Sequence, residues 1–94
     1  MSEVNGLNPC IPEKDLTAQY FRCNDELKEL GEAIQTYIID ETGKNRAEIA
    51  FEAMDVITSV TTLLNMLFSH AEIKAAVRYT NAKNYVRGYC SDGD

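Results

Sequence analysis

The stretches DELKELGEAI (residues 25–34) and FEAMDVITSV (residues 51–60) decide how this chain folds. Each contains two acidic residues three positions apart, Glu26 and Glu29 in the first and Glu52 and Asp55 in the second. On a helix, that spacing places both carboxylates close to one face. The 22 residues between Glu29 and Glu52 are enough to finish one helix, turn and return antiparallel. Four carboxylates would then converge between two helices, where water or a cation is needed to relieve their repulsion.

Apolar residues on either side of the first acidic pair predict a long helix. They recur at gaps of three and four residues, as one stripe of a helix does, at Leu16, Tyr20, Cys23, Leu27, Leu30, Ile34 and Ile38. We expect the helix to start near Pro12–Asp15, because proline suits a first turn and acidic side chains suit the positive end of the helix dipole. Gly43 is the predicted C-cap.

Two further helices follow in the sequence. Asn45 opens a pattern close to a capping box, with Glu48 three residues on, and predicts a second helix that runs to about Phe68. Ser69 precedes a third predicted helix, from His70 to about Tyr85. The fold class is therefore all-α, an antiparallel bundle of three to four helices. Residues 1–94 form a single domain, with a loose lead-in at 1–11 and a frayed tail at 90–94.

The second predicted helix is apolar around most of its circumference. Besides its main stripe, it carries Ile49, Phe51, Val56, Leu63 and Leu67. Such a helix is buried on more than one side. A chain of 94 residues offers little to bury it against, so we expect a homodimer or homotetramer.

The composition excludes several classes of function. A formal net charge of −6 argues against nucleic acid or an anionic membrane surface as the main partner. The longest uncharged stretch, residues 56–71, is too short and too polar to span a membrane. The three cysteines, Cys10, Cys23 and Cys90, form no metal-type or disulfide pattern, and the N-terminus has no signal peptide. We expect reduced thiols and a cytoplasmic protein.

The second acidic pair is the stronger indication of a metal site. Asp55 lies between Met54 and Val56, and an unpaired carboxylate buried there would cost several kcal/mol. Glu52 and Asp55 are therefore expected to be paired, solvated or bound to metal. Oxygen-only ligands select a hard cation, Mg²⁺ or Mn²⁺. Glu48 is better explained as a capping residue, and the acidic face of the first helix could simply be solvated.

The segments ELKELGEAI (26–34) and EAMDVI (52–57) resemble the MazG-like all-α nucleoside triphosphate pyrophosphohydrolases, which carry ExxE and then ExxD on the following helix. The resemblance implies that Glu26, Glu29, Glu52 and Asp55 hold Mg²⁺. It makes Glu29 or Glu32 the catalytic base. Reading Glu29 and Glu32 as the ExxE pair also fits the pattern, so two registers remain open. The resemblance covers roughly residues 16–89.

The last helix adds to the resemblance. Family members often carry Lys, Asn and Arg there to hold phosphates, and Lys83, Asn84 and Arg87 are the matching positions. A polar helix end is the alternative explanation for these three residues. Arg78 and Asn81 are further candidates for phosphate contact.

The expected reaction is hydrolysis of an NTP or dNTP to the monophosphate and pyrophosphate by metal-activated water. The alternative is a non-catalytic helical protein, either a regulatory subunit or a nucleotide-binding module.

Overall fold

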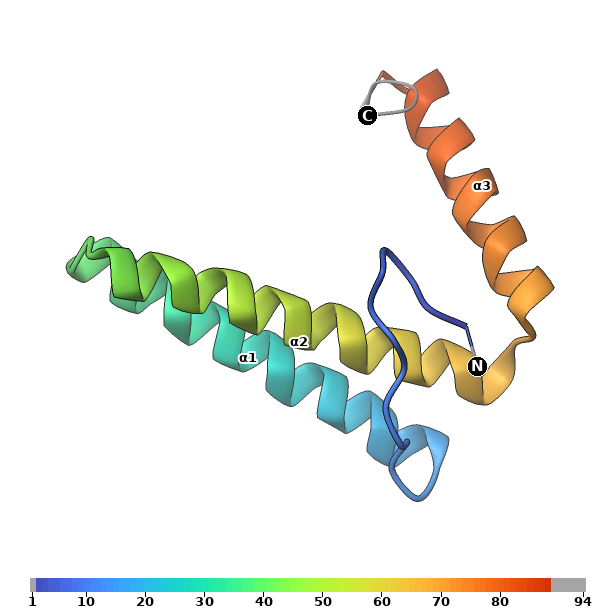
Figure 1. Cartoon of the computed structure of the whole chain (residues 1–94), viewed down its shortest axis with the longest axis horizontal. Coiled ribbons are helices and arrows are strands. Elements are labelled where there is room, and N and C mark those ends of the chain that lie inside the picture. Colours follow the sequence, from blue (N-terminus) through green and yellow to red (C-terminus); the bar gives the residue numbers. More distant parts are fainter. Residues whose placement is uncertain (1, 89–94) are drawn as a thin grey trace.

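Helices α1 (Leu16–Ile39) and α2 (Gly43–Leu67) form an antiparallel hairpin, and α3 (His70–Val86) extends away from its end (Figure 1). The computed structural model describes residues 2–88. Within these residues there is no strand, only an isolated bridge between Val4 and Leu7. The predicted all-α class is therefore confirmed. Among the described residues only α1 and α2 pack extensively against each other, so the predicted bundle of three to four helices is not formed within one chain.

The turn between α1 and α2 differs from the prediction. Thr42 caps α2, with its Oγ1 accepting a hydrogen bond from the Asn45 backbone N–H at 3.1 Å. Asn45 lies inside the helix, and its side chain donates to the Asp40 carbonyl at the end of α1. Gly43 is the first residue of α2 and has no left-handed backbone conformation, so it is not a C-cap. Glu48 lies in the second turn of α2, too far along to cap it.

Helix α1 begins at the end of the predicted range Pro12–Asp15. Asp15 is the N-cap, and its carboxylate accepts from the Ala18 backbone N–H at 2.8 Å. Pro12 and Glu13 therefore precede the helix. For α3, the predicted capping box is present, because Ser69 and Glu72 each accept the other's backbone N–H.

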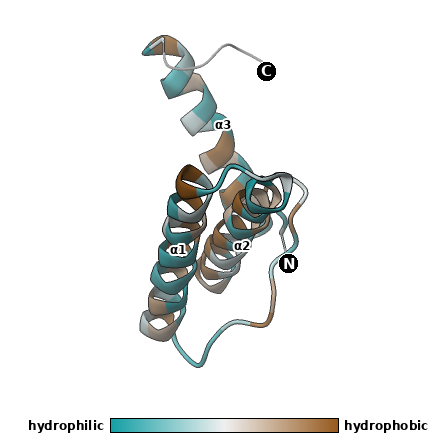
Figure 2. Cartoon of the chain, turned by 90° about the vertical axis from the view of Figure 1, so that its left-hand side faces the viewer, coloured by the Kyte–Doolittle hydropathy of each residue, from teal (hydrophilic) through white to brown (hydrophobic). Residues whose placement is uncertain are grey.

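The face of α1 that packs against α2 coincides with the apolar stripe seen in the sequence only at Cys23 and Leu30. The least exposed residues of α1 recur along an inner face at Gln19, Cys23, Glu26, Leu30, Ala33 and Tyr37. Most of the apolar stripe, including Leu16, Tyr20, Leu27, Ile34 and Ile38, is exposed. The inner face therefore carries a glutamine and a glutamate between apolar residues, and a second apolar face has no cover within the chain. Figure 2 shows apolar residues at intervals along all three helices.

Hydroxyl groups occupy the buried part of α2. Ser59, Thr61 and Thr62 are its buried residues. Their hydroxyls donate to the carbonyls of Val56, Ile57 and Thr58 within the helix, at 2.8–2.9 Å. These bonds satisfy the hydroxyls locally, so small polar residues can be buried without an outside partner.

Residues 2–13, here called the N-terminal strap, are tied to the hairpin by polar contacts. Ser2 exchanges two hydrogen bonds with the Asn65 side chain, at 2.6 and 2.7 Å. The Cys10 backbone N–H donates to Thr62 Oγ1 at 2.9 Å. Asn5 and Gly6 turn the chain with positive φ angles of 53° and 78°, as a tight turn between antiparallel segments requires. The predicted lead-in at 1–11 thus has backbone hydrogen bonds to side chains of α2, at Ser2 and at Cys10. The predicted tail at 90–94, with Cys90, lies outside the described residues.

Little apolar surface is buried within one chain. Among residues 2–88, Ile73 on α3 is the only buried hydrophobic residue, at 3% exposure. Large apolar side chains are exposed on all three helices, including Phe21, Phe51 and Val86. Helix α2 is long and apolar enough to cross a membrane by length and composition alone. The same exposure is expected of helices that pack against a second copy of the chain.

Candidate metal centre

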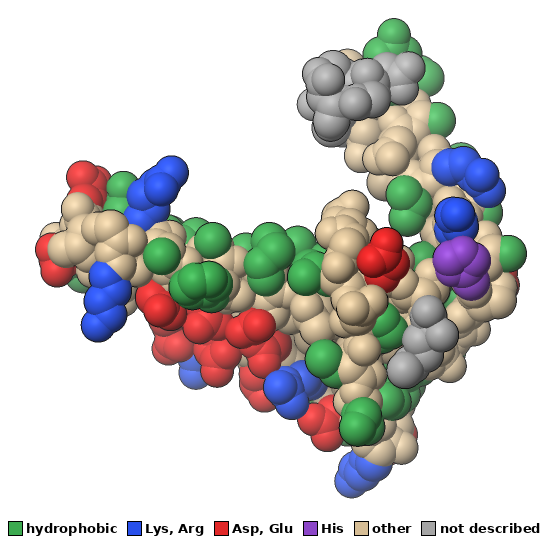
Figure 3. Space-filling model, viewed as in Figure 1, with side chains coloured by type: hydrophobic (Ala, Val, Ile, Leu, Met, Phe, Trp, Pro, Cys, Tyr) green, Lys and Arg blue, Asp and Glu red, His purple; other side chains and the backbone are tan. Residues whose placement is uncertain are grey.

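Three carboxylates converge between α1 and α2. Oxygen atoms of Glu26, Glu52 and Asp55 all lie within 4.8 Å of one another. The antiparallel hairpin brings Glu26 from the middle of α1 opposite Glu52 and Asp55 from the middle of α2. Figure 3 shows acidic side chains gathered along one edge of the hairpin. Carboxylates this close to one another repel, so their arrangement favours a cation between them.

Glu52 has one carboxylate oxygen that neither solvent nor a donor within residues 2–88 satisfies. Its Oε2 is buried and has no hydrogen-bond partner among the described residues. A buried carboxylate oxygen without a donor is unfavourable, and a divalent cation would satisfy it. This orphaned oxygen is a second observation, independent of the clustering, that fits the acidic residues to a metal ion.

Glu29 lies one turn beyond Glu26 on α1 and is influenced by the charges of the three clustered carboxylates. Repulsion from Glu26 raises the pKa of Glu29 above its ordinary value of 4.5, with smaller contributions from desolvation and from Glu52 and Asp55. Glu29 is exposed, so it faces solvent at the rim of the cluster. A carboxylate held at the solvent-facing rim of a cation site is placed to accept a proton from water.

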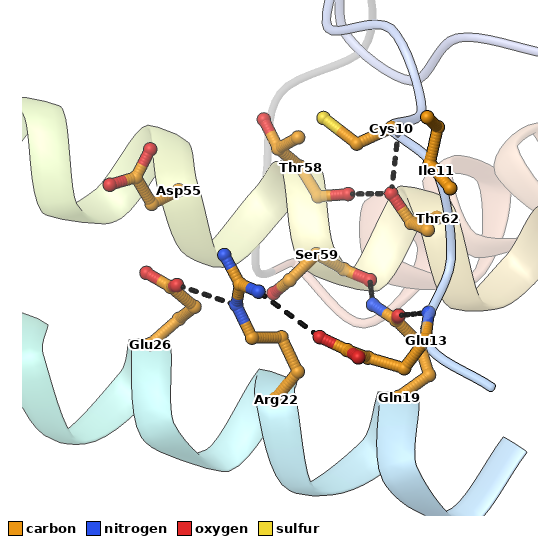
Figure 4. A pocket seen from close by; sticks show the side chains of 10 residues that line it. All are labelled: Cys10, Ile11, Glu13, Gln19, Arg22, Glu26, Asp55, Thr58, Ser59 and Thr62. Carbon is orange, nitrogen blue, oxygen red and sulfur yellow. Dashed lines mark hydrogen bonds and ion pairs between the residues drawn. The ribbon is translucent and has the colours of Figure 1, made fainter. Parts of the chain in front are cut away.

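One cationic side chain pairs with the cluster. The Arg22 Nε donates to Glu26 Oε1 at 3.0 Å, and its Nη1 donates to Glu13 Oε1 on the strap at 3.2 Å (Figure 4). Only 12% of the Glu26 side chain is exposed, against 54% for Arg22. The hydrogen bond to Glu26, and then the one to Glu13, raise the pKa of Arg22.

Two small cavities open on either side of the cluster. The first, of about 190 Å³, lies between the strap, α1 and α2. Its walls are mostly polar and include Gln19, Arg22, Glu26, Asp55, Thr58, Ser59 and Thr62 (Figure 4). The second, of about 380 Å³, is lined by Glu29, Glu32, Ala33, Thr36, Asn45, Glu48 and Glu52. The acidic cluster therefore lies between two polar cavities, and one of them is closed by the strap.

Within one chain, the structure brings together most of the acidic residues expected from the sequence. Glu26, Glu52 and Asp55 form the cluster, with Glu29 at its rim. Glu32 is exposed and shares the 380 Å³ cavity with Glu29 and Glu48. This placement favours Glu26 and Glu29 as the first pair over Glu29 and Glu32, because Glu26 is on the inner face of α1.

The residues expected to hold phosphates lie elsewhere. Lys83, Asn84 and Arg87 are at the end of α3, which points away from the hairpin (Figure 1). Lys83 and Arg87 line a separate shallow cavity with Tyr79, Ala82 and Val86. Arg78 and Asn81 also belong to α3. Within one chain, none of these residues lines either cavity beside the acidic cluster.

Sequence reasoning missed three side chains that build the site, Arg22, Glu13 and Gln19. Arg22 and Glu26 are four residues apart on one helix, a spacing that favours an ion pair and could have been noticed. The contact with Glu13 requires the strap to fold back onto α1, which no local pattern indicates. Gln19 is 3% exposed and bonds both the strap and α2, at the Glu13 backbone N–H and the Ser59 carbonyl.

Comparisons of this chain with protein-family models, with curated proteins and with solved structures found no match.

Proposed function

We propose that this chain is a Mg²⁺-dependent nucleoside triphosphate pyrophosphohydrolase of the MazG-like type, acting on an NTP or dNTP. The observation that carries the proposal is the convergence of Glu26, Glu52 and Asp55 within 4.8 Å, two of them from an ExxD pair and one from an ExxE pair. The ordered motifs and the antiparallel hairpin agree with what the resemblance implies.

The donor set fits a hard divalent cation. Carboxylate oxygens are the ligands that Mg²⁺ and Mn²⁺ prefer, and the orphaned Glu52 Oε2 is available to one. Glu26, Glu52 and Asp55 would hold the cation, with Glu29 completing the set from the rim. When bound, such a cation supplies positive charge that offsets a triphosphate and acidifies a coordinated water.

The chain's own residues account for the remaining chemistry. Glu29 is the favoured proton acceptor, because it lies one turn from Glu26 at the rim of the cluster and faces solvent. Glu32 is the second candidate, since it borders the same cavity. Water attacks the α-phosphorus of the triphosphate, its proton passes to the carboxylate, and pyrophosphate leaves with the electron pair of the broken P–O bond.

A second copy of the chain is part of the proposal. The exposed apolar stripe of α1 and the exposed apolar residues of α2 and α3 favour a homodimer or homotetramer. Lys83, Asn84 and Arg87 would then reach the acidic cluster of another copy, since α3 projects away from its own. The free thiols of Cys10 and Cys23 are consistent with a location in the reducing cytoplasm.

One assay tests the proposal. The protein is incubated with a panel of NTPs and dNTPs, with Mg²⁺ and with EDTA, and pyrophosphate is measured. We expect release that depends on Mg²⁺ and is lost on chelation. If well-folded protein releases no pyrophosphate from any nucleotide, the enzyme is excluded and the non-catalytic alternative is left. A nucleotide-binding module would still bind a triphosphate in that case, whereas a regulatory helical protein would not.

A further inference from the structure

Arg22 lies where α1, the N-terminal strap and the acidic cluster meet. Its guanidinium bridges two carboxylates, Glu26 in the cluster and Glu13 on the strap, with one nitrogen for each (Figure 4). Lys and Arg are otherwise absent from the described residues that line the two cavities beside the cluster. Arg22 is therefore the one protein cation that partly neutralises this region.

The charges around the 190 Å³ cavity are unbalanced. Glu13, Glu26 and Asp55 line it against the single guanidinium of Arg22. With Glu52, the third carboxylate of the cluster, the formal charge is −3. One divalent cation reduces that charge to −1. A triphosphate cannot approach the cavity favourably before this happens, and afterwards a guanidinium beside it becomes attractive to phosphate oxygens.

We propose that Arg22 is an exchangeable partner of Glu26. In the cation-free protein Arg22 holds Glu26, and a divalent cation bound by Glu26, Glu52 and Asp55 takes its place. The released guanidinium, still paired with Glu13, then binds phosphate oxygens of the substrate. This inference rests on the proposed function and supplies it with a phosphate contact from the same chain, which the distant Lys83 and Arg87 do not provide.

The geometry allows this exchange at low cost. More than half of the Arg22 side chain is exposed, so its guanidinium can turn without disturbing the packing between α1 and α2. Glu26 is mostly buried, but it changes one cationic partner for another and is never left unpaired. A guanidinium presents a planar fork that matches two phosphate oxygens, which a lysine cannot do.

The first experiment measures Mn²⁺ binding by calorimetry without nucleotide. Arg22→Gln should bind Mn²⁺ about two- to fivefold more tightly than wild type, because a competing cation has been removed from a partly exposed ion pair. Lys28→Gln is the matched control, since Lys28 is an exposed residue of α1 with no ion pair among the described residues, and its loss changes the net charge equally. An equal effect in both variants, or weaker Mn²⁺ binding by Arg22→Gln, overturns the exchange.

The second experiment measures binding of inorganic pyrophosphate at saturating Mg²⁺. Whereas Arg22→Gln should strengthen Mn²⁺ binding, it should weaken pyrophosphate binding about tenfold relative to wild type. Arg22→Lys should recover part of that loss and Lys28→Gln none of it. Unchanged pyrophosphate affinity in Arg22→Gln overturns the phosphate contact.

The two proposals fail in different ways. If wild type binds Mn²⁺ and releases pyrophosphate but Arg22→Gln behaves as Lys28→Gln does, the role of Arg22 is overturned and the proposed function stands. If wild type binds Mn²⁺ and Arg22→Gln changes Mn²⁺ and pyrophosphate binding as expected, but wild type hydrolyses no nucleotide, the enzymatic function is overturned and the exchange at Glu26 stands. Absence of Mn²⁺ binding in wild type overturns both.

Discussion

Glu52 is the most constrained residue of the acidic cluster, because one of its oxygens is buried without a donor. Its neighbours Glu26 and Asp55 are also carboxylates, so their like charges repel Glu52 while no cation is present. The residue is tolerated at a cost to stability, which is common for side chains that serve a binding site.

The first prediction concerns Glu52→Gln. Without divalent cation, the variant should melt at the same temperature as wild type or higher, because a repelling charge is lost and the new amide can donate to a neighbouring carboxylate. Mn²⁺ affinity should fall at least about tenfold, and pyrophosphate release should be abolished. Thermal melting and calorimetry measure the two effects. Glu48→Gln, one turn earlier on α2, is the control; equal losses in both variants would refute the special position of Glu52.

The second prediction follows from the raised pKa of Glu29. A carboxylate whose pKa is higher in the folded than in the unfolded chain favours folding below its ordinary pKa of 4.5, and that contribution disappears as the pH rises through the folded value. In cation-free protein, the melting temperature of wild type should therefore fall across this window more than that of Glu29→Gln. Glu32→Gln is the control for charge loss on the same helix. Identical pH profiles for wild type and Glu29→Gln would contradict the repulsion.

At the scale of elements, one buried glutamine joins the strap to both helices of the hairpin. Gln19 uses both ends of its amide, donating to the Ser59 carbonyl at 3.0 Å and accepting from the Glu13 backbone N–H at 2.9 Å. It thereby joins three segments, α1, α2 and the strap, beside the cavity that contains Arg22. The Glu13 backbone that Gln19 holds belongs to the same residue whose carboxylate pairs with Arg22. Gln19 therefore also helps to position the Arg22–Glu13 ion pair.

The third prediction is that Gln19→Leu destabilises the protein by about 1–3 kcal/mol, since it removes two hydrogen bonds and leaves the Glu13 backbone N–H without its partner. The loss should appear as a lower denaturation midpoint and as faster amide exchange at Glu13. Gln35→Leu, at an exposed position of the same helix, makes the same chemical change and should stay within about 0.5 kcal/mol of wild type. If Gln35→Leu costs as much as Gln19→Leu, the buried bridge is not what stabilises the strap.

Local patterns predicted the elements well and their packing less well. The capping box at Ser69 and Glu72 was readable because it involves residues three positions apart. Thr42 was missed as a cap because Asn45, itself a good capping residue, offers the same signal three residues later. The convergence of Glu26, Glu52 and Asp55 followed from spacing and an antiparallel return. The hydrogen bonds of the strap could not be predicted in this way, since Ser2 and Asn65 are far apart in the sequence and only the fold brings them together.

The apolar stripe of α1 shows why the inner face could not be read from hydropathy. Leu27 and Ile34 belong to the stripe and are exposed, whereas Gln19 and Glu26 face α2. Periodicity identifies an apolar face but not the element that covers it. When a helix packs on two sides, the sequence alone does not say which side meets its own chain.

At the scale of the whole molecule, exposed apolar surface is the dominant feature. A single chain buries one hydrophobic residue among residues 2–88, and an apolar cavity of about 570 Å³ lies between α3, the end of α2 and the strap. A membrane and a second copy of the chain are the two environments that could cover such surface. Helix α2 has the length for a membrane, but Glu52 and Asp55 lie near its middle, where each charge would cost about 2.5–3.5 kcal/mol. A second copy would cover the same apolar residues and leave the carboxylates exposed to solvent, so it is the environment that agrees with the proposed metal centre.

The fourth prediction is therefore that detergent-free protein has a light-scattering mass of two or four chains. Phe51→Lys should shift that mass toward one chain and make the melting temperature depend more strongly on protein concentration, because Phe51 is 62% exposed on α2 and would meet the partner there. Asn24→Lys adds the same charge at an exposed polar position of α1 and should leave the mass unchanged. A wild-type mass of one chain would refute the oligomer, and with it the delivery of Lys83 and Arg87 from another copy. Arg22 would then be the phosphate contact on which the proposed reaction depends.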